Sequence, residues 1–98
     1  MEQQIINKLQ KDAEQEIGPM PVKRGEIPSL ELLFKFYRFY IIKSPDSIDT
    51  KENMVLTSLC SNSKQHVVKV AEKHYNIDYI NFTSKFHDWN KINNPNEY

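Results

Sequence analysis

Residue types that commonly carry out chemistry in proteins are scarce in this sequence, which has one cysteine and three histidines. Cys60 lies on the apolar side of a predicted helix, where a small buried thiol is expected rather than a nucleophile. His66, His74 and His87 have no second histidine, cysteine or acidic residue at a recognisable metal-ligand spacing. We therefore predict neither a nucleophilic cysteine nor a metal site.

Loops that bind phosphate or calcium are not indicated either. Gly18 and Gly25 are the only glycines, and both fall in a proline-rich linker rather than in a phosphate-binding loop. Asp46, Asp49 and Glu52 lack the glycine that a calcium loop requires, and helix capping explains them better. We predict no catalytic residues, no cofactor and no small-molecule substrate, and keep an enzyme of unfamiliar type as a minor alternative.

The chain of 98 residues is one small domain whose 13 basic and 13 acidic side chains balance. No global field therefore steers it toward nucleic acid or an anionic membrane, although residues 63–92 carry more base than acid. The single cysteine fits a reducing compartment, and the polar N-terminal residues do not resemble a secretory signal. No apolar run approaches the ~20 residues that span a bilayer. We expect an intracellular protein, nuclear or cytoplasmic, with no membrane partner.

Glycines and prolines divide the chain. Residues 1–17 predict an amphipathic N-terminal helix, and residues 18–28 form a linker that contains both glycines and three of the five prolines. Residues 29–92 form the main helical domain, and residues 93–98 are a polar tail.

The main domain reads as four helical segments, which predicts an all-α fold, a small bundle of four to five helices. Ser29 caps the first segment, and the sequence Asp49-Thr50-Lys51-Glu52 opens the second. Residues 61–63 are expected to break the chain between the second and third segments. Asn76 is expected to end the third segment in the left-handed conformation, and Asp78 to cap the fourth. A strand in FYRFYII is the alternative kept open for the first segment.

The first of these segments is apolar on two sides. One stripe runs from Leu30 to Ile41, and a second comprises Leu32, Phe36 and Phe39. Two interpretations remain open. The segment is either a central helix, covered on one side by the later helices and on the other by the N-terminal helix, or its second stripe is a docking face for a protein partner.

Residues 63–92 read as a helix, a tight turn and a second helix. In the second helix Tyr79, Phe82, Phe86 and Trp89 recur at helical spacing, which predicts a core stripe with Trp89 largely buried. Ala71 lies at the centre of the preceding helix, where a small residue permits close packing. This part of the chain resembles the helix-turn-helix of homeodomain-like and transposase-type DNA-binding domains. The resemblance implies that the second helix enters the major groove of DNA.

The polar residues of this half have the chemistry for such a role. Lysines neutralise phosphates, and asparagine, serine and lysine donate hydrogen bonds to base edges or phosphates. Asp88 would repel the DNA backbone unless it meets a cytosine amine. The candidate DNA-binding residues are Lys64, Gln65, Lys69, Lys73, Asn81, Ser84, Lys85 and Lys91.

We therefore predict a non-catalytic accessory subunit that supplies DNA affinity to a larger complex, such as a DNA-modifying enzyme, and that also contacts a protein partner. The alternative is a protein-interaction adaptor or regulatory module with no nucleic-acid role, in which the lysines form an ordinary solvated face.

Overall fold

A computed structural model describes residues 2–19 and 26–97. Helices account for most of this part of the chain, and no strand occurs within it. The all-α prediction is confirmed, and the strand alternative for FYRFYII is wrong. The elements are α1 (Glu2–Glu16), α2 (Leu30–Lys43), α3 (Lys51–Tyr75), α4 (Tyr79–Asn93) and a short 3-10 helix, η1 (Pro95–Glu97).

Side-chain caps fix where α2 and α4 begin. The Ser29 hydroxyl accepts a hydrogen bond from the Leu32 amide at 3.1 Å, and the Asp78 carboxylate accepts one from the Asn81 amide at 2.8 Å. Each bond satisfies an amide that has no partner inside its helix. Both starts agree with the sequence.

The start of α3 differs from the expected capping box by one residue. Thr50, rather than Asp49, is the cap, and its hydroxyl accepts from the Asn53 amide at 3.1 Å. Glu52 stays in the first turn, where its negative charge interacts favourably with the helix dipole.

The predicted break at residues 61–63 is wrong, because α3 continues through it for 25 residues. Serine and asparagine cost at most ~0.7 kcal/mol per residue relative to alanine in a helix interior. Cys60 and Val67, on either side of the predicted break, are each 1% exposed. Burying one continuous stripe across Ser61, Asn62 and Ser63 therefore outweighs their weak helix propensity.

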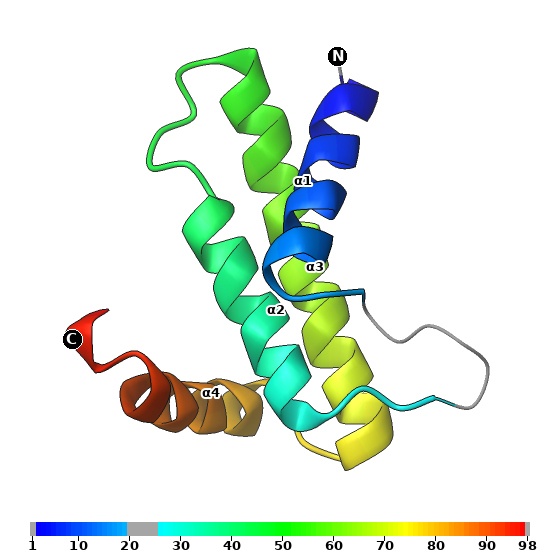
Figure 1. Cartoon of the computed structure of the whole chain (residues 1–98), viewed down its shortest axis with the longest axis vertical. Coiled ribbons are helices and arrows are strands. Elements are labelled where there is room, and N and C mark those ends of the chain that lie inside the picture. Colours follow the sequence, from blue (N-terminus) through cyan, green and yellow to red (C-terminus); the bar gives the residue numbers. More distant parts are fainter. Residues whose placement is uncertain (1, 20–25, 98) are drawn as a thin grey trace.

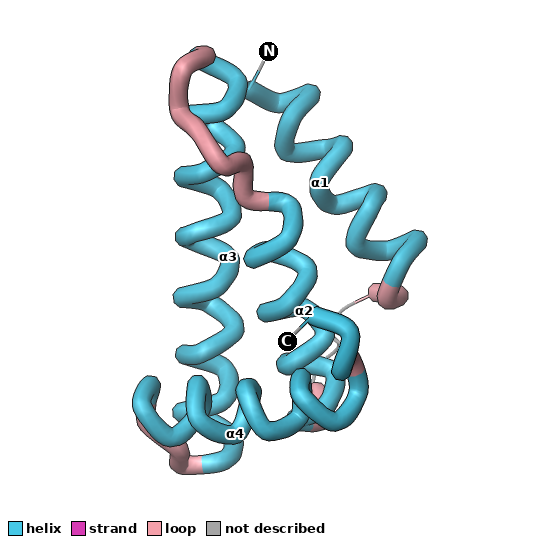
Figure 2. Tube along the Cα trace, turned by 90° about the vertical axis from the view of Figure 1, so that its left-hand side faces the viewer, coloured by secondary structure: helices cyan, strands magenta, loops and turns pink. Residues whose placement is uncertain are grey.

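The helices α2 and α3 form a central pair, and α1 and α4 pack against it. The helices of the central pair run side by side in opposite directions, α1 lies along them, and α4 crosses their lower end in Figure 1. Figure 2 shows the same crossing from the side. This arrangement leaves one long side of α4 free of other helices.

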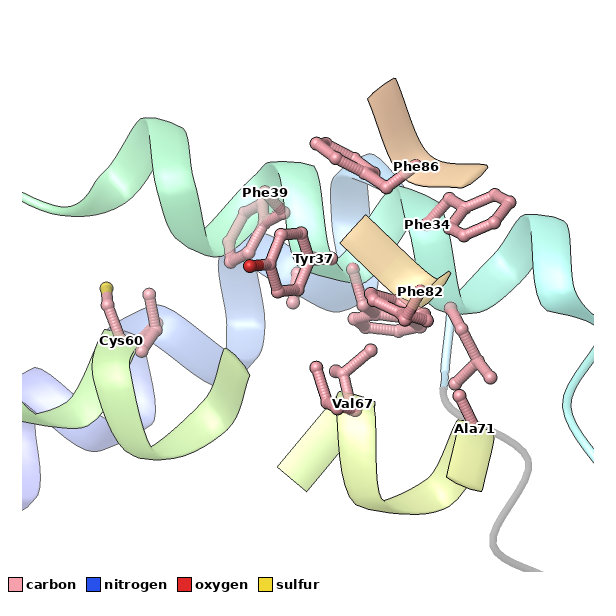
Figure 3. Close-up of a cluster of buried hydrophobic side chains, with 13 residues drawn as sticks. Phe34, Tyr37, Phe39, Cys60, Val67, Ala71, Phe82 and Phe86 are labelled. Carbon is pink, nitrogen blue, oxygen red and sulfur yellow. The ribbon is translucent and has the colours of Figure 1, made fainter. Parts of the chain in front are cut away.

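Aromatic rings join α2 to α4 at the crossing (Figure 3). The ring centroids of Phe34 and Phe82 lie 5.3 Å apart, and those of Tyr37 and Phe86 lie 4.9 Å apart. Such pairs contribute about 0.5–1.5 kcal/mol beyond the area they bury. The predicted core stripe is confirmed at Phe82 and Phe86. Trp89 is only partly buried, beside Phe34 and Phe86 at centroid distances of 5.7 and 6.0 Å.

Both apolar sides of α2 are covered by other parts of the same chain. Phe36 and Phe39 are 3% and 6% exposed, and Leu32 is partly buried against the same core. The open docking face predicted at Leu32, Phe36 and Phe39 is therefore absent. The same core includes Leu9 and Ala13 of α1, but α1 packs mainly against α3 rather than over the second side of α2.

Candidate nucleic-acid interface

One face of α4 is polar and open to solvent. Asn81, Ser84, Lys85 and Asp88 are all exposed, whereas Phe82 on the opposite side is fully buried. Residues spaced three, four and seven apart lie on one side of an α-helix. The four side chains therefore form a continuous surface, which Lys91 extends by another turn because it is also exposed.

A tight turn of three residues sets the position of α4. Asn76 has φ 55° and ψ 42°, the left-handed conformation expected from the sequence, and its amide donates to the Glu72 carbonyl. Asp78 then caps the next helix. Near the same end of α3, the Tyr75 hydroxyl donates to the Pro28 carbonyl oxygen at 2.7 Å. The end of α3 is thereby fixed to the segment that precedes α2.

The candidate residues of α3 lie in two settings. Lys64, Gln65 and Lys69 line a surface groove of about 490 Å³, which also includes Tyr79 from the start of α4. Lys64 is half-buried, and Gln65 and Lys69 are exposed. Lys73 is exposed but does not line this groove. The structure thus brings three of the four α3 candidates together, and it does not bring them into one pocket with Asn81, Ser84, Lys85 or Lys91.

The charge of this half is modest. Residues 63–92 contain five lysines and three carboxylates. In the groove, Glu72 opposes Lys64 and Lys69, and on the α4 face Asp88 opposes Lys85 and Lys91. A small local excess of this kind gives weak, salt-sensitive attraction to a polyanion.

Tyr79 lies outside the core stripe that the sequence predicts for α4. It was expected in the core stripe, yet its side chain is 57% exposed. Burial, and secondarily the neighbouring Tyr79 hydroxyl, raise the pKa of Tyr37 to about 12. The sequence does contain a signal for the exposure of Tyr79, namely the cap residue Asp78. A cap at that position makes Tyr79 the first residue of the helix, before the turns of α4 that pack at the crossing.

Cys60 is a buried, free thiol. It is 1% exposed, and burial raises its pKa, an effect that the nearby Lys64 ammonium partly opposes. A raised pKa lowers the thiolate fraction, and the thiolate is the nucleophile. The expectation that Cys60 is buried is confirmed.

Among residues 2–19 and 26–97, no three histidine, cysteine, aspartate or glutamate side chains gather as metal ligands would. No helix in that same part of the chain has the length and apolarity needed to cross a bilayer.

Comparisons of the chain with protein-family models, with curated proteins and with solved structures gave no match.

Proposed function

We propose that the chain binds double-stranded DNA through the exposed face of α4 and acts as an accessory subunit, supplying DNA affinity to a larger complex such as a DNA-modifying enzyme. One observation carries the proposal. Asn81, Ser84, Lys85 and Asp88 form a single exposed face on a helix that lies across the end of its neighbours. The major groove is about 12 Å wide and admits one α-helix.

The chemistry of the face supports this role. Asn81 has an amide that can pair with an adenine edge, and Lys85 can donate to guanine. Asp88 accepts from a cytosine amine. The lysines Lys69 and Lys73 of α3 would contact phosphates, which position the protein without reading sequence. Because the local charge is small, we expect the isolated chain to bind with a Kd of about 10⁻⁴ to 10⁻⁶ M. Weak binding of that kind suits a subunit that works inside a larger assembly.

The test is a fluorescence anisotropy titration of a labelled duplex at several salt concentrations. Replacing Lys69 and Lys73 with glutamine should weaken binding to every sequence and reduce the salt slope by about one unit per lost contact. The matched control replaces Lys8 and Lys11 of α1, which are equally exposed but lie outside the proposed interface. Absence of duplex binding at low salt, both for the chain alone and with its natural partner, would contradict the proposal, as would equal losses for both double variants.

A second measurement separates reading of bases from contact with phosphates. Asn81→Ala and Lys85→Gln should reduce the difference in affinity between duplexes of different sequence. The lysine variants of α3 should leave that difference unchanged. If both groups of variants behave alike, α4 does not enter the groove.

An adaptor role is the second candidate, and exposed isoleucines favour it. Ile80 and Ile92 of α4 are 75% and 79% exposed. Exposed apolar side chains mark a protein-binding surface when they gather into a patch, and Ile80 is next to Tyr79, which is 57% exposed. If duplex binding is absent both for the chain alone and for the chain with its natural partner, the adaptor role is the one to retain.

A further inference from the structure

The groove between α3 and the start of α4 has features that the proposed function does not use. Its volume of about 490 Å³ lies within the range of about 300–1,000 Å³ typical of small-molecule sites. Lys64, Gln65 and Lys69 come from α3, and Tyr79 comes from α4. Two cationic side chains and an exposed aromatic ring therefore border the same depression.

The ring of Tyr79 is open to solvent. The residue is 57% exposed, and it lines the groove together with Tyr37, which is only 8% exposed. Among the residues that line the groove, Tyr79 thus offers an exposed aromatic surface on which a ligand can stack.

The charged groups of the groove favour an anion. Lys64 and Lys69 outnumber its single carboxylate, Glu72, and the Gln65 side chain adds neutral hydrogen-bond donors. Lys64 is half-buried, so its aliphatic stem packs along the groove while its ammonium group can stay in water. Val68 supplies an apolar patch in the same lining.

We infer that this groove binds a nucleotide, with the base stacked on Tyr79 and the phosphate bound by Lys64 and Lys69. Aromatic stacking combined with basic groups is the chemistry by which proteins bind unpaired nucleotides. The inference deepens the proposed function and rests on it in one respect, since Lys64 and Lys69 belong to the same proposed nucleic-acid surface. The nucleotide is either part of an unpaired strand or a free mononucleotide.

The experiment is an NMR titration of the full ¹⁵N-labelled chain at low salt. Four probes are added separately: hexathymidylate, thymidine 5′-monophosphate, thymidine and inorganic phosphate. We expect shifts at the amides of residues 64–69 and 79 with the first two probes, and weaker effects with thymidine or phosphate alone. Stronger binding of hexathymidylate identifies an unpaired strand as the source. Equal binding of the two nucleotides identifies a mononucleotide.

Variants then test the two groups in the groove. Tyr79→Ala should weaken binding of hexathymidylate by about tenfold or more, because it removes the stacking ring. Tyr79→Phe keeps the ring and should retain most of the affinity. Lys64→Gln should also weaken binding, because it removes one of the two cations assigned to the phosphate. Ile80→Ala, at the next and even more exposed position, is the control for α4, and Lys8→Gln is the charge control for Lys64→Gln. Nucleotide binding that survives Tyr79→Ala unchanged, or shifts confined to other residues, would overturn the inference.

The inference and the proposed function fail in different ways. Duplex binding that depends on Asn81 and Lys85, without any binding of hexathymidylate or thymidine 5′-monophosphate, overturns the groove and supports the DNA role of α4. Nucleotide binding that depends on Tyr79, without duplex binding, overturns the α4 proposal and supports the groove.

Discussion

Phe82 is the residue on which the three main helices converge. It is fully buried, and its ring centroid lies 5.3 Å from that of Phe34 and 5.2 Å from that of Tyr37. Val67 and Ala71 of α3 belong to the same core. The position of α4, and so of its polar face, depends on this contact.

Replacing Phe82 with alanine should destabilise the protein by about 3–5 kcal/mol, because a large cavity would open in a close-packed core. Ile80→Ala, two positions away and 75% exposed, is the control and should change stability by about 0.5 kcal/mol or less. Urea unfolding followed by circular dichroism measures both. Equal small effects would mean that α4 does not pack as described.

Tyr37 should make the protein less stable at alkaline pH. Its pKa is about 12 when folded, against an ordinary value of 10.0. Below pH 10 the phenol is protonated in both states, so its contribution to stability is complete. Between these two values the unfolded state loses the proton that the folded state keeps, and the free energy of unfolding falls as pH rises. Burial also raises the pKa of Tyr40 and Cys60, which act in the same direction.

The measurement compares the wild type with Tyr37→Phe, which cannot ionise at this position. Between about pH 9 and about pH 11, the free energy of unfolding of the wild type should fall relative to that of the variant. Parallel pH profiles would show that Tyr37 ionises equally readily in both states.

At the scale of elements, the continuity of α3 is the feature that most changes the shape of the molecule. A break at residues 61–63 would have produced two short helices with independent directions. Instead, one helix of 25 residues packs against α1, α2 and α4 along its length. It holds the groove lysines in line with the turn that leads to α4.

Substitutions at Asn62 test that continuity. This residue is exposed in the middle of α3, so its side chain contributes little packing. In a helix interior, Asn62→Gly should be about 1 kcal/mol less stable than Asn62→Ala. At a break or cap, glycine would be tolerated as well as alanine or better. Thermal unfolding of the two variants distinguishes these cases.

Local signals predicted the ends of the helices well. Ser29, Asn76 and Asp78 act within one turn, and their hydrogen bonds depend only on neighbouring amides. The centre of α3 was mispredicted for the opposite reason, since the burial of Cys60 and Val67 against other helices overrides the preference of the residues between them.

The candidate surface was predictable only in part. Helical spacing correctly gave the exposed residues of α4, because the position of Phe82 and Phe86 fixes the opposite face. Spacing did not reveal the groove, which forms where Tyr79 of α4 meets Lys64 and Lys69 of α3. That meeting depends on how two helices cross, and no local pattern encodes the crossing.

At the scale of the whole molecule, the fold is flat and its core is thin. Its principal extents are 37 × 36 × 24 Å, and its radius of gyration is 14.0 Å, against about 13 Å for a typical compact chain of 100 residues. Each helix therefore supplies a large share of the buried surface, and α1 is the clearest case. It contributes Leu9 and Ala13 to the core, and its Asp12 and Glu16 lie 3.9 and 3.6 Å from the Lys43 ammonium of α2.

Deletion of residues 2–17 should consequently lower stability by several kcal/mol and promote self-association. Burial of Leu9 alone is worth about 1.5–3 kcal/mol, a substantial fraction of the 5–15 kcal/mol typical of a small protein. Removing α1 would also expose apolar side chains of α2 and α3, including Leu56, which lies near Leu9, and Phe39, which lies near Ile17. Lys43→Ala is the control, because it removes only the partly exposed ion pairs, each worth about 1 kcal/mol or less. Urea unfolding and sedimentation measure the two effects. A truncated chain that stays monomeric and unfolds at the same urea concentration would mean that α1 is an appendage, and that the apolar side of α2 beneath it is free to receive a protein partner.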